Sequence, residues 1–412
     1  MLLRRLFVSV AVLACAACAT TGSPPPVIEV DEPVALVDQA VHIRVTGLDA
    51  GEGVEIGLEG RAADGVEWRR RRRAARRARR SSGTWEADGD GVVDLREDPP
   101  LTGSYEGADA MGLFWSMDPP SDDRDGQAML PPGAGPGEQF EDFGLDVTVR
   151  ADGRAPVRRK LVRRWLADGV TARELSLTED GVAGVLFSPG TGAPARRPVL
   201  LIGGSDGEPL ALTAVLLASR GFPALALDYF GGAGLPATLR DVPLEYVATA
   251  AEVLRQASGS GTVAVAGYSR GSEAALLVSH HRPDLVRGTV LYAPSDVVWP
   301  AFPPPGDAWT LAGEPVPLGP IPVDGVTGPV LTVSGGRDLE WDASAQAGRI
   351  VDALAAAGVP HRSLDYPAAG HAVGIPPYLA LSPNGGNTRT RAADAAARAD
   401  GWPQVLELLA SS

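Results

Sequence analysis

The chain has very little cysteine and little histidine. Its 412 residues include two cysteines, Cys15 and Cys18, and both lie within the first twenty positions. The rest of the chain therefore has no disulfide framework and no thiolate metal site. Only five histidines occur, so a catalytic base can be sought by elimination. No metal and no cofactor is expected.

Positive charge is also in deficit, because the formal net charge is −14. This balance argues against a general nucleic-acid binder. The apolar run near the N-terminus, residues 6–13, is too short to cross a bilayer as a stable helix. At 412 residues the chain is nevertheless long enough for two domains with sizeable cores.

Residues 1–18 have the order of a secretory signal peptide, with two arginines before the apolar run and small residues after it. The segment ends on cysteine and is followed by Ala-Thr-Thr-Gly-Ser-Pro-Pro-Pro, which resembles a bacterial lipoprotein signal. We expect Cys18 to carry the lipid, with Cys15 as the second choice; ordinary cleavage beside two incidental cysteines is the alternative. Several acyl chains on one cysteine would anchor the protein to a membrane of the bacterial cell envelope, with residues 19–29 as the linker.

Alternating apolar and polar residues dominate positions 30–150, for example at 40–45 and 54–60. This pattern is typical of half-buried strands, and another hairpin is expected over residues 83–95. Short strands separated by Gly and Asp turns predict an all-β sandwich domain.

Two segments of this region stand apart from the strand pattern. Residues 69–80 are mostly arginine; they indicate either a patch for polyanions or anionic lipid or, as we favour, a solvated strand pair or loop. The apolar cluster at 111–117 is expected to pack between domains, and lining a substrate pocket is the alternative.

Strands alternate with helices over residues 151–412. We expect buried strands at 199–202, 223–228, 263–266, 289–292 and 330–333, and helices at 211–220, 244–257, 388–399 and 402–409. This alternation predicts a mostly parallel, doubly wound sheet, and the order of the motifs below indicates an α/β-hydrolase fold.

The second domain is organised around residues 262–277, which contain a G-x-S-x-G motif with Ser269 at its centre. An apolar strand precedes the motif and a helix follows it, which is the context of a nucleophile elbow. A turn this sharp requires residues without a Cβ beside the serine, and Gly267 and Gly271 meet that need. The alternative is an ordinary Gly/Ser loop between a strand and a helix.

A serine needs a base, and the base needs an acceptor. His371 follows the last expected strand in a Gly-flanked loop, and Asp338 follows the strand at 330–333, which gives the chain order Ser, Asp, His. Glu340 and Asp342 are the fallbacks for the acid. We expect structural or surface roles for the other histidines, His42, His280, His281 and His361.

An oxyanion hole needs two N–H donors. One is expected at the backbone of Arg270, directly after the serine, and the other at Gly204 or Ser205 in the loop after an early strand. An ordinary strand–helix turn is the alternative for that loop.

These residues carry a family resemblance. The chain resembles the acyl-CoA thioesterase and bile acid-CoA:amino acid N-acyltransferase family over about residues 30–412, through the stretches 103–107, 111–116, 220–230, 334–341, 366–371 and 402–406. The resemblance implies a β-sandwich before an α/β-hydrolase domain, and activity on acyl-CoA thioesters. Family members that transfer the acyl group to an amino acid usually carry cysteine at the elbow, so Ser269 implies hydrolysis. The elbow departs from the family at Ser272, where a glycine is expected.

Three other functions stay open. A carboxylesterase or peptidase, or an acyltransferase, could use the same three residues. A non-catalytic envelope lipoprotein could bind anionic lipid through residues 69–80. Coenzyme A thioesters are cytoplasmic, so an exported enzyme would act on another acyl thioester or ester.

Overall fold

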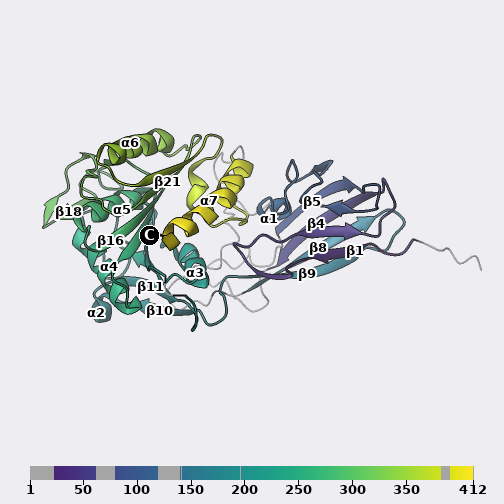
Figure 1. Ribbon diagram of the computed structural model, residues 1–412, viewed down its shortest axis with the longest axis horizontal. Helices are drawn as coiled ribbons and strands as arrows, with labels where there is room; N and C mark the ends of the chain where they lie inside the picture. The colour runs from purple at the N-terminus through teal and green to yellow at the C-terminus, as the bar shows by residue number, and fades with distance from the viewer. Residues whose placement is uncertain are drawn as a thin grey trace, which may run out of the picture.

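The computed structural model describes residues 23–61, 79–118, 140, 142–194, 196–381 and 390–411, which form two lobes (Figure 1). The signal segment with Cys15 and Cys18, and most of the arginine run at 69–80, lie outside the described residues. Within the described ranges, no helix is long and apolar enough to cross a membrane.

The N-terminal lobe is a β-sandwich of two sheets. The smaller sheet has the order β1 (Val27–Val30), β3 (Ile43–Thr46), β6 (Val93–Asp94). The larger has the order β2 (Val34–Leu36), β9 (Val157–Arg164), β8 (Phe143–Ala151), β4 (Gly53–Arg61), β5 (Arg79–Glu86), β7 (Thr102–Gly103). Inward-facing residues such as Ile43, Ile56 and Val147 are fully buried, which confirms the expected sandwich.

Two expectations for this lobe differ from the structure. Residues 83–95 do not form a hairpin, because β5 pairs with β4 and β7 while β6 pairs with β3 in the other sheet. The turn after β5 thus joins the two sheets. The junction between the lobes also lies later than residue 150. Strand β9 pairs along β8 inside the sandwich, whereas β10 (Thr171–Leu175) already pairs in the second lobe.

The second lobe is built on one eight-stranded sheet. Its order is β10, β11 (Ala183–Ser188), β13 (Ala224–Asp228), β12 (Val199–Ile202), β15 (Val263–Tyr268), β16 (Val286–Tyr292), β21 (Val330–Gly335), β22 (His361–Tyr366). The strands from β13 to β22 pair in parallel, and β10 and β11 are antiparallel. This is the expected α/β-hydrolase fold.

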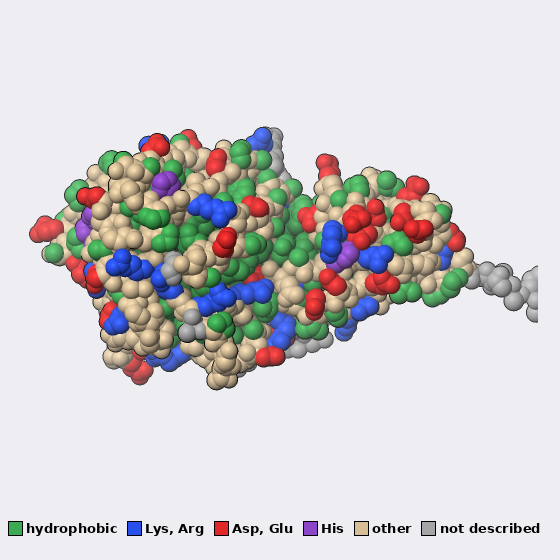
Figure 2. Space-filling model, in the orientation of Figure 1, with side chains coloured by type: hydrophobic (Ala, Val, Ile, Leu, Met, Phe, Trp, Pro, Cys, Tyr) green, Lys and Arg blue, Asp and Glu red, His purple; other side chains and the backbone are tan. Residues whose placement is uncertain are grey.

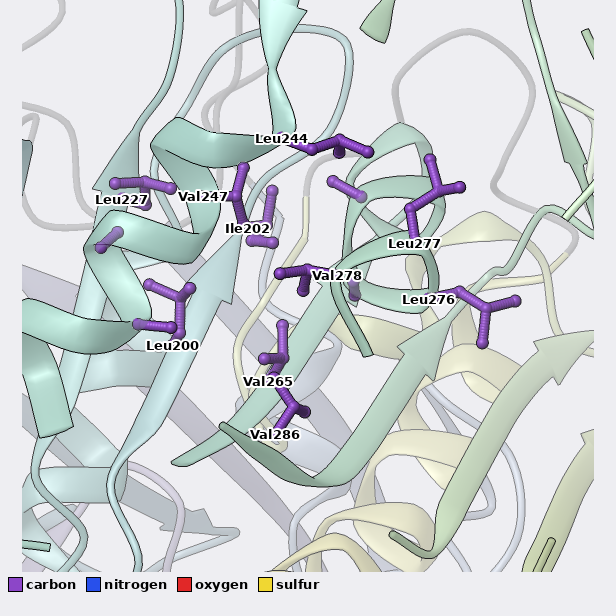
Figure 3. Packing of buried hydrophobic residues seen from close by; sticks show 14 of the residues in the cluster. Leu200, Ile202, Leu227, Leu244, Val247, Val265, Leu276, Leu277, Val278 and Val286 are labelled. Atoms are coloured by element: carbon purple, nitrogen blue, oxygen red, sulfur yellow. The ribbon is translucent and has the colours of Figure 1, made fainter. Parts of the chain in front are cut away.

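Helices cover both faces of this sheet. One face packs against α3 (Ala211–Ser219) and α7 (Arg391–Ser411), and the other against α4 (Leu244–Ser258), α5 (Arg270–His281) and α6 (Ala343–Ala356). Figure 3 shows Leu244 and Val247 of α4 on the side of α5 that carries Val278, above the strands, whereas Leu276 points away from α4. The two helices expected at 388–399 and 402–409 are a single helix, α7, which continues through Pro403.

Short elements complete the described chain. They are α1 (Gly112–Trp115), α2 (Leu177–Asp180), β14 (Val242–Pro243), β17 (Val297–Val298), β18 (Trp309–Leu311), β19 (Glu314–Pro315), β20 (Gly319–Pro320) and the 3-10 helix η1 (His371–Gly374). All four residues of α1 are buried, and the apolar cluster to which they belong joins the sandwich core to Ala380 and Ala395 of the second lobe, so this segment packs between the lobes as expected.

The two lobes share a buried contact centred on Asp38. The Asp38 carboxylate accepts hydrogen bonds from Arg220 (2.8 and 2.9 Å) at the end of α3 and from the indole N–H of Trp402 (2.9 Å) in α7. Apolar side chains continue across the junction of the lobes (Figure 2). Both contacts fix α3 and α7, and the face of the sheet that they cover, against the sandwich.

Candidate active site

Ser269 occupies a strained turn between β15 and α5. Its backbone has φ 55° and ψ −123°, a conformation that is costly for a residue with a Cβ. A Cβ on Gly267 would lie 2.3 Å from the carbonyl oxygen of Gly271, and a Cβ on Gly271 would lie 2.3 Å from that of Gly203. The two glycines of the motif are therefore required by close backbone packing.

Ser272 stands where the family resemblance calls for glycine, and the structure gives it a role. Its hydroxyl donates to the carbonyl oxygen of Ser269 (2.6 Å) and accepts from the backbone N–H of Ser295 (3.0 Å). The Ser269 N–H donates to the carbonyl oxygen of Tyr292 (2.9 Å). The elbow is thus tied to the loop that follows β16.

His371 and Asp338 meet directly. Nδ1 of His371 lies 2.7 Å from Oδ2 of Asp338, and the Asp338 side chain is 1% exposed. The other carboxylate oxygen accepts the backbone N–H of Glu340 (2.8 Å). A proton on Nδ1 leaves Nε2 free to accept another. The two fallback acids do not take this place. Asp342 caps α6 at the backbone N–H of Ala345, and the Glu340 side chain is exposed.

The base also lies beside the elbow. The rings of His371 and Tyr268 have centroids 5.2 Å apart, and the Tyr268 hydroxyl donates to the carbonyl oxygen of His371 (2.9 Å). Burial raises the pKa of Tyr268 well above its usual range, so this donor keeps its proton at any physiological pH. Three distant segments of the chain are thus brought to one edge of the sheet.

The loop after β12 approaches the serine. A Cβ built on Gly204 would lie 3.4 Å from Cβ and 3.8 Å from Oγ of Ser269. The buried Tyr229 hydroxyl lies 2.9 Å from the carbonyl oxygen of Gly203 and 2.8 Å from that of Gly204, and its proton is shared between them. The N–H of Ser205 belongs to the same trans peptide as the Gly204 carbonyl, so it points away from Tyr229.

The side chain of Arg270 is part of a buried network that the sequence alone did not reveal. Its Nε donates to the carboxylate of Glu273, and its Nη2 donates to the backbone carbonyls of Trp299 (3.1 Å) and Pro300 (2.9 Å). Glu273 also accepts the indole N–H of Trp309 (2.9 Å). Burial raises the pKa of Glu273, and Arg270 opposes that rise. The only sequence signal was an Arg and a Glu three positions apart on the elbow helix.

Two tryptophans border the base. The Trp341 ring meets the His371 ring edge-on at 6.1 Å, and Trp299 stacks on Trp341 at 6.4 Å with 14° between the planes. Their indole N–H groups donate to the carbonyl oxygen of Ala293 and to the hydroxyl of Ser295. Trp299 remains 42% exposed, so apolar surface is available beside the base.

Other candidate features lie away from this edge. His42 bonds to Asp94 in the sandwich, and Nδ1 of His280 accepts the backbone N–H of Gly325. A groove of about 490 Å³ runs between α4 and α5 and includes His281, at the end of α5 opposite Ser269. Among the residues that the structure describes, no group of three or more His, Cys, Asp or Glu could hold a metal ion.

Both lobes match families of known proteins. Residues 38–177 match the family described as "Acyl-CoA thioester hydrolase/BAAT N-terminal region", and residues 202–412, about half of the chain, match the "Dienelactone hydrolase family". The chain belongs to the acyl-CoA thioesterase and bile acid-CoA:amino acid N-acyltransferase family. It is accordingly an enzyme of the thioester and ester hydrolase type.

Some relatives of the chain are named as acyl-CoA thioesterases and others as amino acid N-acyltransferases. Acyl-coenzyme A thioesterase 6 of Mus musculus is 29% identical over 326 residues, which cover 73% of this chain and 76% of that protein. Acyl-coenzyme A amino acid N-acyltransferase 1 of Mus musculus is 27% identical, covering 84% of this chain and 86% of that protein. Acyl-coenzyme A thioesterase 3 of Mus musculus is 34% identical, covering 58% of this chain and 52% of that protein.

Proposed function

We propose that the chain is a serine hydrolase that cleaves acyl thioesters through Ser269, Asp338 and His371. The observation that carries the proposal is the hydrogen-bonded pair of His371 and Asp338 beside a serine in a strained elbow. A base oriented by a buried carboxylate is the arrangement that turns a serine hydroxyl into a nucleophile.

The reaction has two halves. Oγ of Ser269 attacks the acyl carbonyl while Nε2 of His371 takes its proton, and the negative oxygen is held by the backbone N–H of Arg270 and that of Gly204 or Ser205. The bond from carbonyl carbon to sulfur breaks, and the imidazolium gives its proton to the leaving sulfur. Water, deprotonated by His371, then attacks the acyl-serine; the carboxylic acid leaves, and Ser269 recovers its proton.

The nucleophile supports hydrolysis over transfer to an amino acid, because the family resemblance associates serine with thioesterases. Several relatives named acyl-CoA thioesterase match this chain. An oxyester substrate is the second candidate, since the same three residues would cleave one. The exposed Trp299, which stacks on the Trp341 that meets the base, offers an apolar surface for either kind of substrate.

A probe and a substrate panel test the proposal. The purified full chain is treated with a fluorophosphonate, and then assayed on thioesters and oxyesters that share the same acyl groups. We expect labelling that is lost in Ser269→Ala, and faster turnover of thioesters. Unlabelled wild-type protein would remove the serine mechanism, and equal or faster turnover of oxyesters would leave an esterase instead.

The site of action is proposed from the sequence, because Cys15 and Cys18 lie outside the described residues. We place the enzyme at the bacterial cell envelope, anchored by lipid on Cys18. Cells fed an alkyne-tagged fatty acid should incorporate the tag into the wild type and Cys15→Ser but not into Cys18→Ser. A tag retained by Cys18→Ser and lost from Cys15→Ser would move the anchor to Cys15, and no tag in any form would exclude an anchor.

A further inference from the structure

One face of α7 joins the sandwich to the loop that carries His371. Arg391, Asp394, Ala395 and Arg398 are spaced by three, four and seven positions, so they share a helix face. Asp394, Ala395 and Arg398 are each at most 4% exposed. Figure 1 shows α7 on the side of the hydrolase lobe that faces the sandwich.

Asp394 binds the backbone directly before the base. One of its carboxylate oxygens accepts the N–H of Gly370 (2.5 Å), and the other accepts the hydroxyl of Thr390 (3.0 Å). With the Tyr268 hydroxyl on the carbonyl oxygen of His371, the backbone is held on both sides of the base. The loop itself has few regular hydrogen bonds, since it forms only one turn of 3-10 helix.

Arg398 binds the same loop further along. Its guanidinium lies within hydrogen-bond range of the carbonyl oxygens of Pro376 (3.4 Å) and Leu379 (3.3 Å), and its Nε donates to the carbonyl oxygen of Asp394 (3.1 Å). Asp394 and Arg398 therefore bracket the loop from Gly370 to Leu379 with two buried, oppositely charged side chains.

The same helix turns are bound to the sandwich. Arg391 donates to the carboxylate of Asp118 (2.6 Å) and to the carbonyl oxygen of Met117 (2.7 Å). Asp118 is in turn bridged through its backbone to Arg80 of β5. Ala395 belongs to the apolar cluster of the sandwich core. The start of α7 thus has the sandwich on one side and the base loop on the other.

We propose that the β-sandwich lobe serves catalysis by fixing the start of α7, and that Asp394 is the positioning residue through which α7 sets the place of His371. The proposal rests on the proposed serine mechanism for its kinetic readout. Asp394 touches no reacting atom; it acts on the base through Gly370. A shift of about 1 Å in a catalytic group is enough to slow a reaction about a hundredfold, so loss of this anchor should appear in the rate of the chemical step.

The test compares four variants of the full chain. Asp394→Ala removes both hydrogen bonds. Asp394→Asn keeps them, because its amide oxygen can accept from Gly370 and its NH₂ can donate to Thr390. Arg391→Ala releases the sandwich from α7 without touching the loop. Glu407→Ala is the matched control, since it removes an exposed carboxylate from the same helix.

Three readouts are taken on each variant: kcat and KM on the best substrate, the rate of fluorophosphonate labelling, and the NMR resonance of the His371 Nδ1 proton in its bond to Asp338. We expect kcat and labelling of Asp394→Ala to fall about ten- to a hundredfold with KM nearly unchanged, and its Nδ1 resonance to broaden. Asp394→Asn and Glu407→Ala should match the wild type, and Arg391→Ala should fall in the same direction by less.

The outcomes separate the two proposals. A folded Asp394→Ala with wild-type kcat, or equal losses in Asp394→Asn and Asp394→Ala, overturns the positioning role while the serine mechanism stands. If Asp394→Ala does not fold, Arg391→Ala decides, and an unchanged rate in that variant overturns the role of the sandwich. If the wild type is not labelled at all, the serine mechanism fails, and the Nδ1 resonance still reports whether Asp394 holds His371.

Discussion

At the scale of single residues, the site depends on glycines, which have no Cβ, as much as on reactive side chains. Gly267 and Gly271 leave room for backbone oxygens at distances that no Cβ could occupy. Gly204 is different, because a Cβ there would meet Ser269 at ordinary contact distances of 3.4 Å and more. The absence of a Cβ on Gly204 therefore leaves space beside the Ser269 hydroxyl, where we expect the oxyanion of the reacting carbonyl.

Substituting Gly204 tests the oxyanion loop. Gly204→Ala should fold normally, because its contacts are ordinary ones, but the methyl group should crowd the oxyanion. We expect kcat to fall about a hundredfold, as on loss of one oxyanion donor, in steady-state assays. Gly348→Ala, on the exposed side of α6 with open space around it, is the control. An active Gly204→Ala would place the oxyanion elsewhere.

Substituting the acids tests the choice between Asp338 and its neighbours. In Asp338→Asn the amide NH₂ would donate to His371 and force the wrong tautomer, so kcat should drop about ten-thousandfold. Asp342→Asn should keep full activity, because Asp342 only caps α6. Equal losses in the two variants, measured under the same conditions, would contradict the assignment.

The sequence alone selects the candidate residues that have a fixed local signature, and their catalytic roles stay predictions. The elbow serine follows from its glycines, and Asp338 and His371 follow from their places after successive strands. The roles of Ser272, Tyr229 and Asp394 were not predicted, because each binds a backbone group more than twenty residues away. Their roles depend on how strands and helices are placed, which no short motif records.

At the scale of elements, α5 supports the serine elbow and α7 supports the loop that carries His371. Helix α5 begins at the serine and carries the buried Arg270–Glu273 pair. Helix α7 carries the buried Asp394 and Arg398. Burial raises the pKa of Asp394, and burial lowers the pKa of Arg398 to about 10. Both ions are thus held at a cost in desolvation that hydrogen bonds to backbone groups offset.

The raised pKa of Asp394 gives a pH-dependent prediction. The folded chain binds this proton more tightly than the unfolded chain, so its contribution to stability is present below the ordinary Asp pKa and is lost as pH rises through the raised one. Asn does not ionise. The melting temperature of Asp394→Asn relative to the wild type should therefore be higher at pH 7 than at pH 3.5. A melting-temperature difference for Asp394→Asn that shrinks as pH rises would contradict the sign.

At the scale of the whole molecule, the two lobes are joined by a buried charge. Asp38 has no exposed side-chain surface, and its oxygens bind Arg220 and Trp402. The family match at residues 38–177 begins at this residue. The sequence predicted a sandwich followed by an α/β-hydrolase lobe, but it placed their junction at residue 150. Strand β9 is rich in basic residues, VRRKLVRR, which hid its alternation.

Removing Asp38 should loosen the lobes. Asp38→Ala leaves three N–H donors, two on Arg220 and one on Trp402, without their acceptor. We expect a loss of about 3 kcal/mol of stability, measured by calorimetry on the full chain. Asp168→Ala is the control, because Asp168 is 90% exposed in its pair with Arg164 and should cost at most about 1 kcal/mol. Equal losses in the two variants would show that the buried contact does not hold the lobes.

The most direct test of the serine mechanism is the mass of the enzyme during turnover. The full chain is mixed with an acyl thioester, quenched within the first turnovers, digested, and analysed by mass spectrometry. The mechanism predicts one acyl group on the peptide that contains Ser269, absent in Ser269→Ala. An acyl group on another residue, or product formation by Ser269→Ala at the wild-type rate, would contradict it.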